Sequence, residues 1–294
     1  MIMNANIQQL RYLIEIERTR SISQAAENLF IGQPNLSRIV KDMETGCGFA
    51  IFERTRKGVQ PTEKGSAFLK HARNILREVE FMETLGPNGS QPGRFRICIP
   101  RSYTYMDMVQ NFLASVQQPF SGEVRECHPR QAMEYMENGR VEIAVIRYSV
   151  QYQAYFSEQT QANSLSMHLL GKVAYSPVLR SGNPLAGSGS LRQAQLAEMT
   201  EVAHRDVFYP QDRLEANHRR VYAIDRMAQL QLLQNLPNAY LLSEPLPMAY
   251  LDTHGLVQLP CDTDELIYQD AVLYNPQCTI SELENEFLHV LWGI

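Results

Sequence analysis

The chain has 294 residues, of which 44% are hydrophobic and 20% charged, a composition typical of a globular protein that folds as two or three domains. Its apolar runs are too short to span a membrane, and its first residues lack the pattern of a secretory signal peptide, so we expect a cytoplasmic protein. The five cysteines are dispersed and form no CxxC pair. This excludes a disulfide framework and predicts reduced thiols.

The net charge of −5 is unevenly distributed along the chain. Residues 1 to 85 hold 12 Lys/Arg and 10 Asp/Glu, which is +2, while the remaining residues hold 15 and 22, which is −7. A positive surface on an otherwise acidic chain favours contact with phosphates. Scattered, solvated charge is the alternative interpretation, since the local excess is modest.

Residues 7 to 43 predict three short helices. Apolar residues recur at helical spacing from Ile7 to Thr19. The stretch from Ser21 to Met43 then predicts two helices with a tight break before Gln33, and Ser21 is the expected cap. In the last helix the apolar residues should face inward. Amides, a hydroxyl and cations should then face outward, which suits the base edges and phosphates of a DNA major groove, although an ordinary helical hairpin would also have a solvated polar face.

A basic turn follows these helices. Gly46 and Gly48 predict the end of the last helix, Phe49 to Arg54 a short strand, and Arg54 to Val59 a tight turn. Cations in such a hairpin can reach phosphates or a minor groove, although basic hairpin tips are more often simply solvated. The residues that we predict to contact DNA are Ser23, Gln33, Pro34, Asn35, Ser37, Arg38, Lys41, Arg54, Arg56 and Lys57.

A long helix is predicted from Thr62, its expected cap, to about Leu85. An apolar seam runs along it in steps of four, three, four and three residues: Phe68, Ala72, Ile75, Val79 and Met82. This heptad-like spacing predicts pairing with a second copy of the chain. Packing on the helix's own domain is the alternative interpretation.

The first 80 residues resemble the amino-terminal domain of LysR-type transcriptional regulators. The resemblance lies in several blocks that keep the family's order: LRYL at 10 to 13, SQAAENL at 23 to 29, QPNLS at 33 to 37, FER at 52 to 54 and PTEKG at 61 to 65. The chain departs from the family's usual residues at Gly32, where a serine cap is common, and at Cys47. The resemblance implies a winged helix-turn-helix domain at 1–62, a linker and dimerisation helix at 63–86, and two recognition helices that read two half-sites.

The rest of the chain predicts an α/β domain. A flexible linker is expected at 87–93, and strands then alternate with helices, as in parallel βαβ units. We predict one domain over 94–294, with subdomain I at about 94–160 and 266–294 and subdomain II at about 167–265. This order resembles the effector-binding domain of LysR-type regulators, which is similar to periplasmic binding proteins. The expected fold is therefore α/β, with an all-α winged helix-turn-helix, a long linker helix and a two-subdomain effector domain.

Candidate effector-binding residues follow the predicted strands, because ligands of open α/β domains bind beyond the carboxyl ends of strands. Ser102 is also at the family's usual ligand-contact position, although it can equally be a simple helix cap. Several cations near these strand ends favour an anionic effector. No histidine pair has the spacing of a metal site, so no metal is expected. The predicted effector-binding residues are Arg101, Ser102, Thr104, Arg147, His204 and Arg205.

Three functions compete. The first, implied by the resemblance, is a ligand-responsive regulator that binds double-stranded DNA and a small-molecule co-inducer, forms a homodimer or homotetramer and contacts RNA polymerase. The second is a redox-sensing regulator that switches through a cysteine, although the cysteine spacing does not argue for it. The third is an α/β enzyme, which the absence of GxSxG, P-loop, GxGxxG and HExxH motifs disfavours. We therefore predict that the chain is not an enzyme and uses no cofactor.

Overall fold

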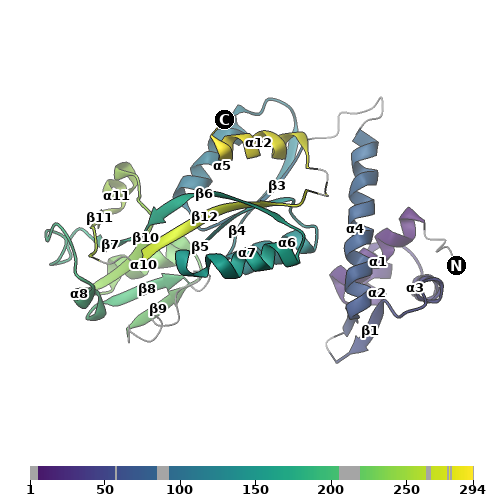
Figure 1. Ribbon diagram of the computed structural model, residues 1–294. Helices are drawn as coiled ribbons and strands as arrows, with labels where there is room; N and C mark the ends of the chain where they lie inside the picture. Colours follow the sequence, from purple (N-terminus) through teal and green to yellow (C-terminus); the bar gives the residue numbers. More distant parts are fainter. Residues whose placement is uncertain are drawn as a thin grey trace. The chain divides into compact units, whose positions relative to one another are not determined.

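The structure is a computed structural model that describes residues 6–56, 58–84, 93–204, 219–262, 266–276, 278 and 280–293. It divides into two compact units, each described by itself below: Met1–Pro92 with Glu137–Arg140, and Gly93–Met136 with Val141–Ile294 (Figure 1). Within the described residues, no helix is long and apolar enough to cross a membrane.

The first unit is a winged helix-turn-helix followed by a long helix. Its buried side chains include Leu13, Leu36 and Leu69, which come from three different helices and form one core. The two strands form an antiparallel hairpin, the wing, whose turn connects Thr55 to Gly58. The elements are α1 (Ile7–Thr19), α2 (Ile22–Asn28), α3 (Gln33–Cys47), β1 (Phe52–Thr55), β2 (Gly58–Pro61) and α4 (Glu63–Thr84). The predicted winged helix-turn-helix and long helix are therefore confirmed.

The helix ends explain several of the motif residues. The Ser21 side chain caps α2 by accepting a hydrogen bond from the Gln24 N–H at 3.3 Å. Gly32 begins α3 without a side-chain cap, as its lack of a hydroxyl requires. The predicted stop at two glycines is wrong for Gly46, which lies inside α3, and right for Gly48, whose φ of 78° ends the helix in the left-handed conformation that glycine favours.

Gly65 allows α4 to pass close to the chain before the wing. A Cβ atom at this position would lie 1.9 Å from the Ile51 carbonyl oxygen, which is far inside any allowed contact. The Thr62 hydroxyl joins the same two segments, because it accepts a hydrogen bond from the Gly65 N–H at 2.9 Å and donates one to the Ala50 carbonyl at 2.6 Å. The PTEKG block therefore fixes the start of α4 against the wing in two ways: the Thr62 hydroxyl caps the helix, and Gly65 has no side chain that would prevent the close approach.

The second unit has two lobes, each built on a five-stranded sheet. In lobe I the strand order is β4-β3-β5-β12-β6; β3 pairs in parallel with β4 and β5, and β12 is antiparallel to β5 and β6. Its elements are β3 (Gly93–Ile99), α5 (Tyr103–Ser115), β4 (Phe120–Glu126), α6 (Pro129–Glu137), β5 (Ile143–Ser149), the 3-10 helix η1 (Val150–Tyr152), α7 (Gln153–Ala162), β6 (Ser166–Ala174), β12 (Ile267–Tyr274) and α12 (Glu282–Trp292).

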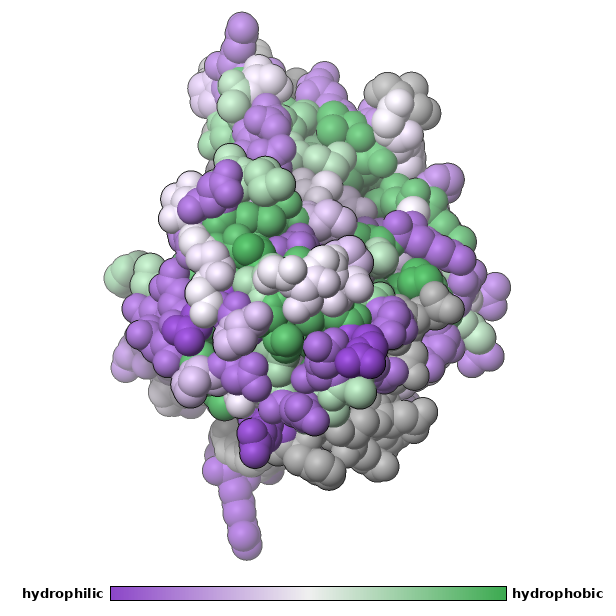
Figure 2. Space-filling view, turned by 90° about the vertical axis from the view of Figure 1, so that its left-hand side faces the viewer, coloured by the Kyte–Doolittle hydropathy of each residue, from purple (hydrophilic) through white to green (hydrophobic). Residues whose placement is uncertain are grey.

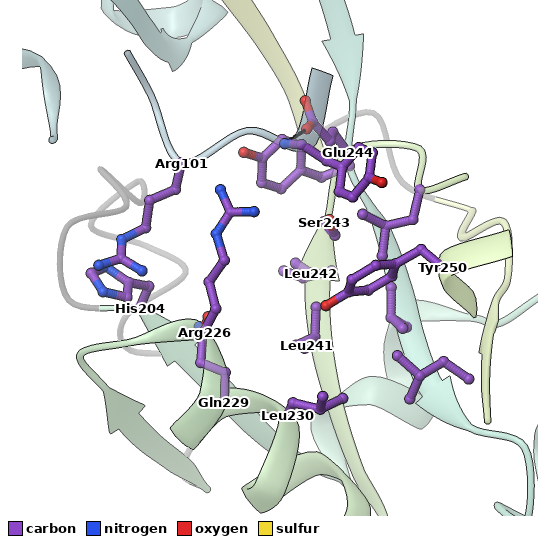
Figure 3. Close-up of a pocket in the computed structure, with 15 residues that line it drawn as sticks. Arg101, His204, Arg226, Gln229, Leu230, Leu241, Leu242, Ser243, Glu244 and Tyr250 are labelled. Atoms are coloured by element: carbon purple, nitrogen blue, oxygen red, sulfur yellow. Dashed lines mark hydrogen bonds between the residues drawn. The ribbon is translucent and has the colours of Figure 1, made fainter. Parts of the chain in front are cut away.

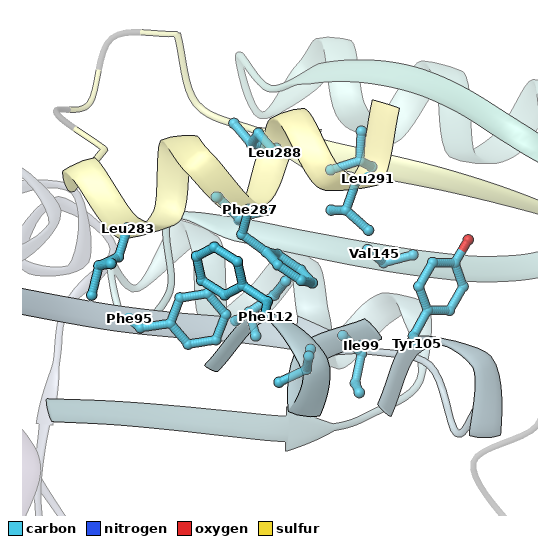
Figure 4. Close-up of a cluster of buried hydrophobic side chains, with 13 residues drawn as sticks. Phe95, Ile99, Tyr105, Phe112, Val145, Leu283, Phe287, Leu288 and Leu291 are labelled. Carbon is cyan, nitrogen blue, oxygen red and sulfur yellow. The ribbon is translucent and has the colours of Figure 1, made fainter. Parts of the chain in front are cut away.

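Both faces of the lobe I sheet are covered by helices. Ile97 of β3 and Val145 of β5 pack against α5 and α12, whereas their neighbours on the same strands, Cys98 and Ala144, belong to the core on the other face. On the α5 and α12 side, the rings of Phe95, Phe112 and Phe287 lie 5.2 to 5.5 Å apart between centroids (Figure 4). Because both faces are covered, consecutive residues of these strands, such as Ile97 with Cys98 and Ala144 with Val145, are apolar.

Lobe II has the strand order β11-β7-β10-β8-β9, in which β10, β8 and β9 are parallel and β7 is antiparallel to its neighbours. Figure 2 shows the side of the second unit that carries this lobe, where apolar residues appear in several patches among polar ones. Its elements are β7 (Ser176–Arg180), α8 (Gln193–Ala197), β8 (Thr200–His204), β9 (Arg220–Ala223), α10 (Arg226–Asn235), β10 (Ala239–Ser243), α11 (Met248–His254) and β11 (Leu256–Gln258).

One boundary of the α/β prediction needs correction. Subdomain II does not begin at residue 167, because β6 belongs to the lobe I sheet and the chain crosses to lobe II only at Tyr175. The Tyr175 N–H donates to the Leu266 carbonyl at 2.8 Å, next to the point where the chain returns. The last helix is capped by Ser281, and most of the predicted linker lies outside the described residues.

Candidate DNA interface and effector site

The outward face of α3 carries the residues that the sequence assigned to DNA. Gln33, Pro34, Asn35, Arg38 and Lys41 are exposed and Ser37 is half-buried, whereas the apolar residues between them are in the core. Two hydrogen bonds along the helix order this face: the Gln33 amide donates to the Ser37 hydroxyl at 2.9 Å, and the Arg38 guanidinium donates to the Asn35 amide oxygen at 3.2 Å. Amide, hydroxyl and guanidinium groups therefore stand together on a rigid helix.

The wing adds cations that are held at a fixed place on the same unit. Arg54 and Arg56 are exposed, and Lys57 lies outside the described residues. The Val59 N–H donates to the carbonyl of Arg20 at 2.9 Å, which fastens the wing to the end of α1. Gly58 permits this approach, because it has a φ of 105° and a Cβ atom there would lie 2.5 Å from the same carbonyl oxygen.

Ser23 lies near the start of α2, the helix before α3, and its side chain is exposed. This places a hydroxyl at a helix N-terminus, where N–H groups can bind phosphate. All nine of the predicted DNA-contacting residues within the described chain are therefore accessible or half-accessible. Their contact with DNA stays a prediction.

The predicted dimerisation seam of α4 is divided between two environments. Ala72 is buried in the core of the first unit and Phe68 packs against that core, so these two residues serve their own domain. Ile75 and Met82 are exposed, with 47% and 59% of their surface accessible, and Val79 is half-buried. The sequence period alone could not separate the two faces, because Leu69 and Leu76 supply the rest of the inward stripe.

A buried ionic cluster lies where lobe I meets lobe II. The Arg147 guanidinium in β5 donates to both oxygens of Asp270 in β12, at 2.6 and 2.8 Å, and to Glu244 Oε2 at 2.7 Å. It also donates to the hydroxyl of Tyr175 at 3.2 Å. Burial opposes the charged form of Arg147, but the Asp270 hydrogen bonds and the surrounding negative charges outweigh it and raise the pKa of the guanidinium. Arg147 is therefore a permanent, fully engaged cation.

Glu244 connects this cluster to the first turn of α5. The Ser102 hydroxyl caps α5 by accepting from the Tyr105 N–H, and it lies 2.8 and 2.9 Å from the two Glu244 oxygens. The backbone N–H groups of Tyr103 and Thr104 also donate to Glu244 Oε1, the latter at 3.1 Å. The donors that the sequence analysis assigned to an effector anion are thus bonded to a carboxylate of the chain itself. The assignment of Ser102 and Thr104 to an effector stays a prediction.

A pocket opens beside Glu244, mainly on lobe II. Figure 3 shows Arg101, His204 and Arg226 on one side of it, and Leu241 and Tyr250 on the other. The Arg101 guanidinium donates to the Ile224 carbonyl at 2.6 Å, and the His204 ring lies within hydrogen-bond distance of the same oxygen. Two of the predicted effector residues, Arg101 and His204, therefore line one pocket. The side chain of Thr104 is exposed, and Arg205 lies outside the described residues.

Two further charged residues at this site, Glu244 and Asp270, were not among the residues predicted from the sequence. Glu244 directly follows strand β10, and so it meets the same strand-end criterion that selected Arg101, Arg147 and His204. Asp270 is the single charged residue of the apolar strand Ile267–Tyr274, a pattern that predicts a buried charge in need of a partner. Both signals were present in the sequence, but neither identifies the partner.

Two cysteines that are distant in sequence come together in lobe I. Cys98 and Cys127 are both buried in the core under α6, and the hydrogen bond that the Cys98 thiol shares with Cys127, together with burial, raises the pKa of Cys98. A raised pKa disfavours the reactive thiolate. Within the described residues, no group of acidic, histidine and cysteine side chains could hold a metal ion.

The fold and these surfaces define a class: a winged helix-turn-helix joined to a two-lobed α/β domain with a pocket beside the lobe junction. Residues 7–66 match the family model described as bacterial regulatory helix-turn-helix protein, lysR family. Residues 7–66 therefore form a helix-turn-helix domain of the lysR family.

The chain is similar to several named members of the family. It is 38% identical over 94 residues, 32% of this chain and 31% of the relative, to the nitrogen assimilation regulatory protein nac of Klebsiella aerogenes. It is 28% identical over 211 residues, 69% of this chain and 65% of the relative, to the RuBisCO operon transcriptional regulator of Allochromatium vinosum. The matches thus span less than two thirds of either relative. ArgP from Mycobacterium tuberculosis shares the fold, with a TM-score of 0.69 and 17% identity over 97% of this chain and 95% of that one.

Proposed function

We propose that the chain is a ligand-responsive transcriptional regulator that binds double-stranded DNA through α3 and the wing. The observation that carries the proposal is the division of α3: Leu36, Val40 and Met43 are buried, while Asn35 and Arg38 stand exposed and joined to each other. An amide and a guanidinium on one helix face can both form two-point hydrogen bonds with base edges. The wing cations supply phosphate contacts, which position the helix.

The first experiment compares wild type with Arg38→Ala and Arg54→Ala for binding to DNA from the region upstream of the chain's own gene. Fluorescence anisotropy is measured at several salt concentrations with unrelated DNA as competitor. Loss of a base contact at Arg38 reduces affinity for the specific DNA by about 10- to 150-fold, and affects competitor DNA less. Loss of a phosphate contact at Arg54 weakens binding to both DNAs and reduces the slope of log K against log salt by about one.

Lys172→Ala is the matched control for the change in charge. Lys172 is an exposed cation of β6 in the α/β domain, so its loss changes the net charge by the same amount without touching the winged domain. The proposal predicts wild-type affinity for this variant. Equal losses for Arg38→Ala and Lys172→Ala would instead indicate a general charge effect, and would count against α3 as the recognition helix.

The exposed apolar residues of α4 support a homodimer as the working form. Ile75 and Met82 are seven residues apart and Val79 lies between them, which is the spacing of a single stripe on a helix. A second copy of the same stripe is the simplest cover, and two copies would present two recognition helices to two half-sites. Tetramer formation and contact with RNA polymerase are further proposals that only the family resemblance supports.

The effector site in this proposal is the pocket beside Glu244. Its walls combine cations with aromatic and aliphatic side chains, a lining that suits a small amphipathic molecule with a negatively charged group. Such a molecule would shift the equilibrium between two arrangements of the lobes only to the extent that its affinities for the two arrangements differ. The redox alternative receives less support, because the paired thiols Cys98 and Cys127 are buried and the pKa of Cys98 is raised.

A further inference from the structure

Glu244 has the environment of a bound ligand rather than that of an ordinary side chain. Its carboxylate is 2% exposed and receives hydrogen bonds from a hydroxyl, two backbone N–H groups and a guanidinium. These donors come from α5 and β5 of lobe I, whereas Glu244 follows β10 of lobe II. We call this set of donors, contributed by Ser102, Tyr103, Thr104 and Arg147, the carboxylate cradle.

The cradle has the chemistry of an anion site. The first N–H groups of an α-helix have no partner within the helix and lie at its positive end, so they bind carboxylates readily. Here α5 has 13 residues, and its first turn is supplemented by a buried guanidinium whose other nitrogen atoms are already held by Asp270. Because Asp270 holds the Arg147 guanidinium, Arg147 cannot reorient toward another partner. The cradle is therefore preorganised to bind one carboxylate.

We propose that Glu244 is a built-in ligand, whose carboxylate occupies the cradle and joins the two lobes in place of an exogenous carboxylate. Because it is tethered, its effective concentration at the cradle is far above that of any free competitor. A molecule that binds this domain therefore uses the neighbouring pocket, with Glu244 as one wall. A short free carboxylate can enter the cradle only when Glu244 is shortened.

Glu244 joins the lobes beside other contacts between them, such as the bond from Arg101 to the Ile224 carbonyl, and this position gives the built-in ligand a regulatory meaning. The regulatory reading rests on the proposed function, since only in a ligand-responsive regulator would joining the lobes matter to DNA binding. The occupation of the cradle itself does not rest on it. The two statements are separable, because acetate binding can be measured on the full chain without DNA.

Glu244→Ala provides the test, because it removes the atoms of one acetate ion from the side chain and leaves the cradle empty. The thermal unfolding midpoint is measured in sodium acetate and in sodium chloride at equal ionic strength and pH 7. Wild type unfolds at the same temperature in both salts. Glu244→Ala unfolds at a lower temperature in chloride, and acetate at ten times its dissociation constant raises its midpoint by about 3–6 °C.

Two further variants separate a cradle from a general effect of acetate. Glu244→Gln keeps the shape of the side chain and fills the cradle, so acetate leaves its midpoint unchanged. Glu201→Ala removes another buried carboxylate, which pairs with Arg220 at 2.7 Å within lobe II, and acetate leaves that variant unchanged as well. If acetate raised the midpoints of Glu201→Ala and Glu244→Ala equally, acetate would be pairing with any guanidinium that has lost its carboxylate. The effect would then not be specific to the cradle.

Three results would overturn the proposal: no difference between acetate and chloride for Glu244→Ala, an equal response of Glu244→Gln, or failure of Glu244→Ala to fold in either salt. In the last case a free carboxylate cannot replace the tethered one, and Glu244 is a structural ion pair only. Folding in acetate but not in chloride would support the proposal. A failure of the DNA-binding experiment alone leaves all of these outcomes unchanged.

Discussion

Arg147 and Asp270 face each other on adjacent antiparallel strands, in direct register, and form a two-point ion pair at 2.6 and 2.8 Å. The Tyr105 hydroxyl also donates to Asp270, at 3.0 Å. Because both strands are buried, Arg147 and Asp270 cannot exchange their mutual hydrogen bonds for hydrogen bonds to water. It fixes the guanidinium plane and leaves one edge pointing at Glu244.

Removal of the Asp270 charge should therefore be costly. Asp270→Asn keeps the shape of the side chain but replaces one acceptor with an amide N–H that faces the Arg147 donors. Breaking one side of a buried ion pair costs about 3–5 kcal/mol. Urea unfolding at pH 7 measures this loss. Glu134→Gln, at an exposed position of α6, is the control and should change the free energy of unfolding by less than about 0.5 kcal/mol. Similar stabilities for the two variants would contradict the central role of the pair.

Features that depend on residues close together in the sequence could be predicted from the sequence alone. Ser21 and Thr62 cap helices as their positions predicted, since a cap depends on residues only three positions away. The winged helix-turn-helix could be recognised for the same reason. By contrast, the bond between Ser102 and Glu244 spans 142 residues, and no local pattern encodes it.

The crossing between the lobes was missed for a different reason. From Ser166 to Arg180 the chain stays extended, and the hydrophobic pattern continues through Tyr175. Nothing in these residues indicates that β6 pairs with β12 while β7 pairs with β10 and β11. Sheet membership depends on which distant strand supplies the partner, so it requires the tertiary structure.

The close approach at Gly65 predicts a large effect for the smallest possible substitution. Gly65→Ala places a Cβ atom 1.9 Å from the Ile51 carbonyl oxygen and 2.7 Å from its carbon, so backbone must move. Such overpacking costs about 1–3 kcal/mol. Gly46→Ala is the matched control, because it lies inside α3 with no atom within 4 Å of the added methyl, and it should stabilise the helix by up to about 1 kcal/mol. Chemical denaturation followed by circular dichroism measures both changes, and a neutral Gly65→Ala would refute the steric argument.

The exposed stripe on α4 predicts a change in assembly. Ile75→Glu introduces a charge at an exposed position, so it should leave the fold of the first unit intact while two such stripes repel each other. Sedimentation velocity should then show a shift from dimer toward monomer. Met248→Glu is the control, since Met248 is 72% exposed on lobe II and should leave the assembly unchanged. An unaltered sedimentation coefficient for Ile75→Glu would remove this stripe as the dimer contact.

Glu284 predicts a pH dependence whose sign can be derived. Its buried carboxyl group accepts hydrogen bonds from the N–H groups of Arg96 and Ser281, at 2.9 and 3.0 Å. Burial and the negative charge of Glu142 nevertheless raise its pKa above the usual value of 4.5. The folded chain therefore keeps this proton at pH values where the unfolded chain has released it. In that window the folded state binds more protons, so the free energy of unfolding falls as pH rises.

The measurement is the difference in free energy of unfolding between wild type and Glu284→Gln, whose amide does not titrate. Urea unfolding of both proteins from pH 4 to pH 8 gives this difference, in which the contributions of other groups cancel. The stability of wild type relative to Glu284→Gln should be constant below about pH 4.5 and should fall above it until the folded carboxyl group has ionised. Glu282→Gln, at an exposed first-turn position of the same helix, is the control for the loss of one carboxylate from this helix. Parallel curves for wild type and Glu284→Gln would show that Glu284 has the same pKa in the folded and unfolded chain.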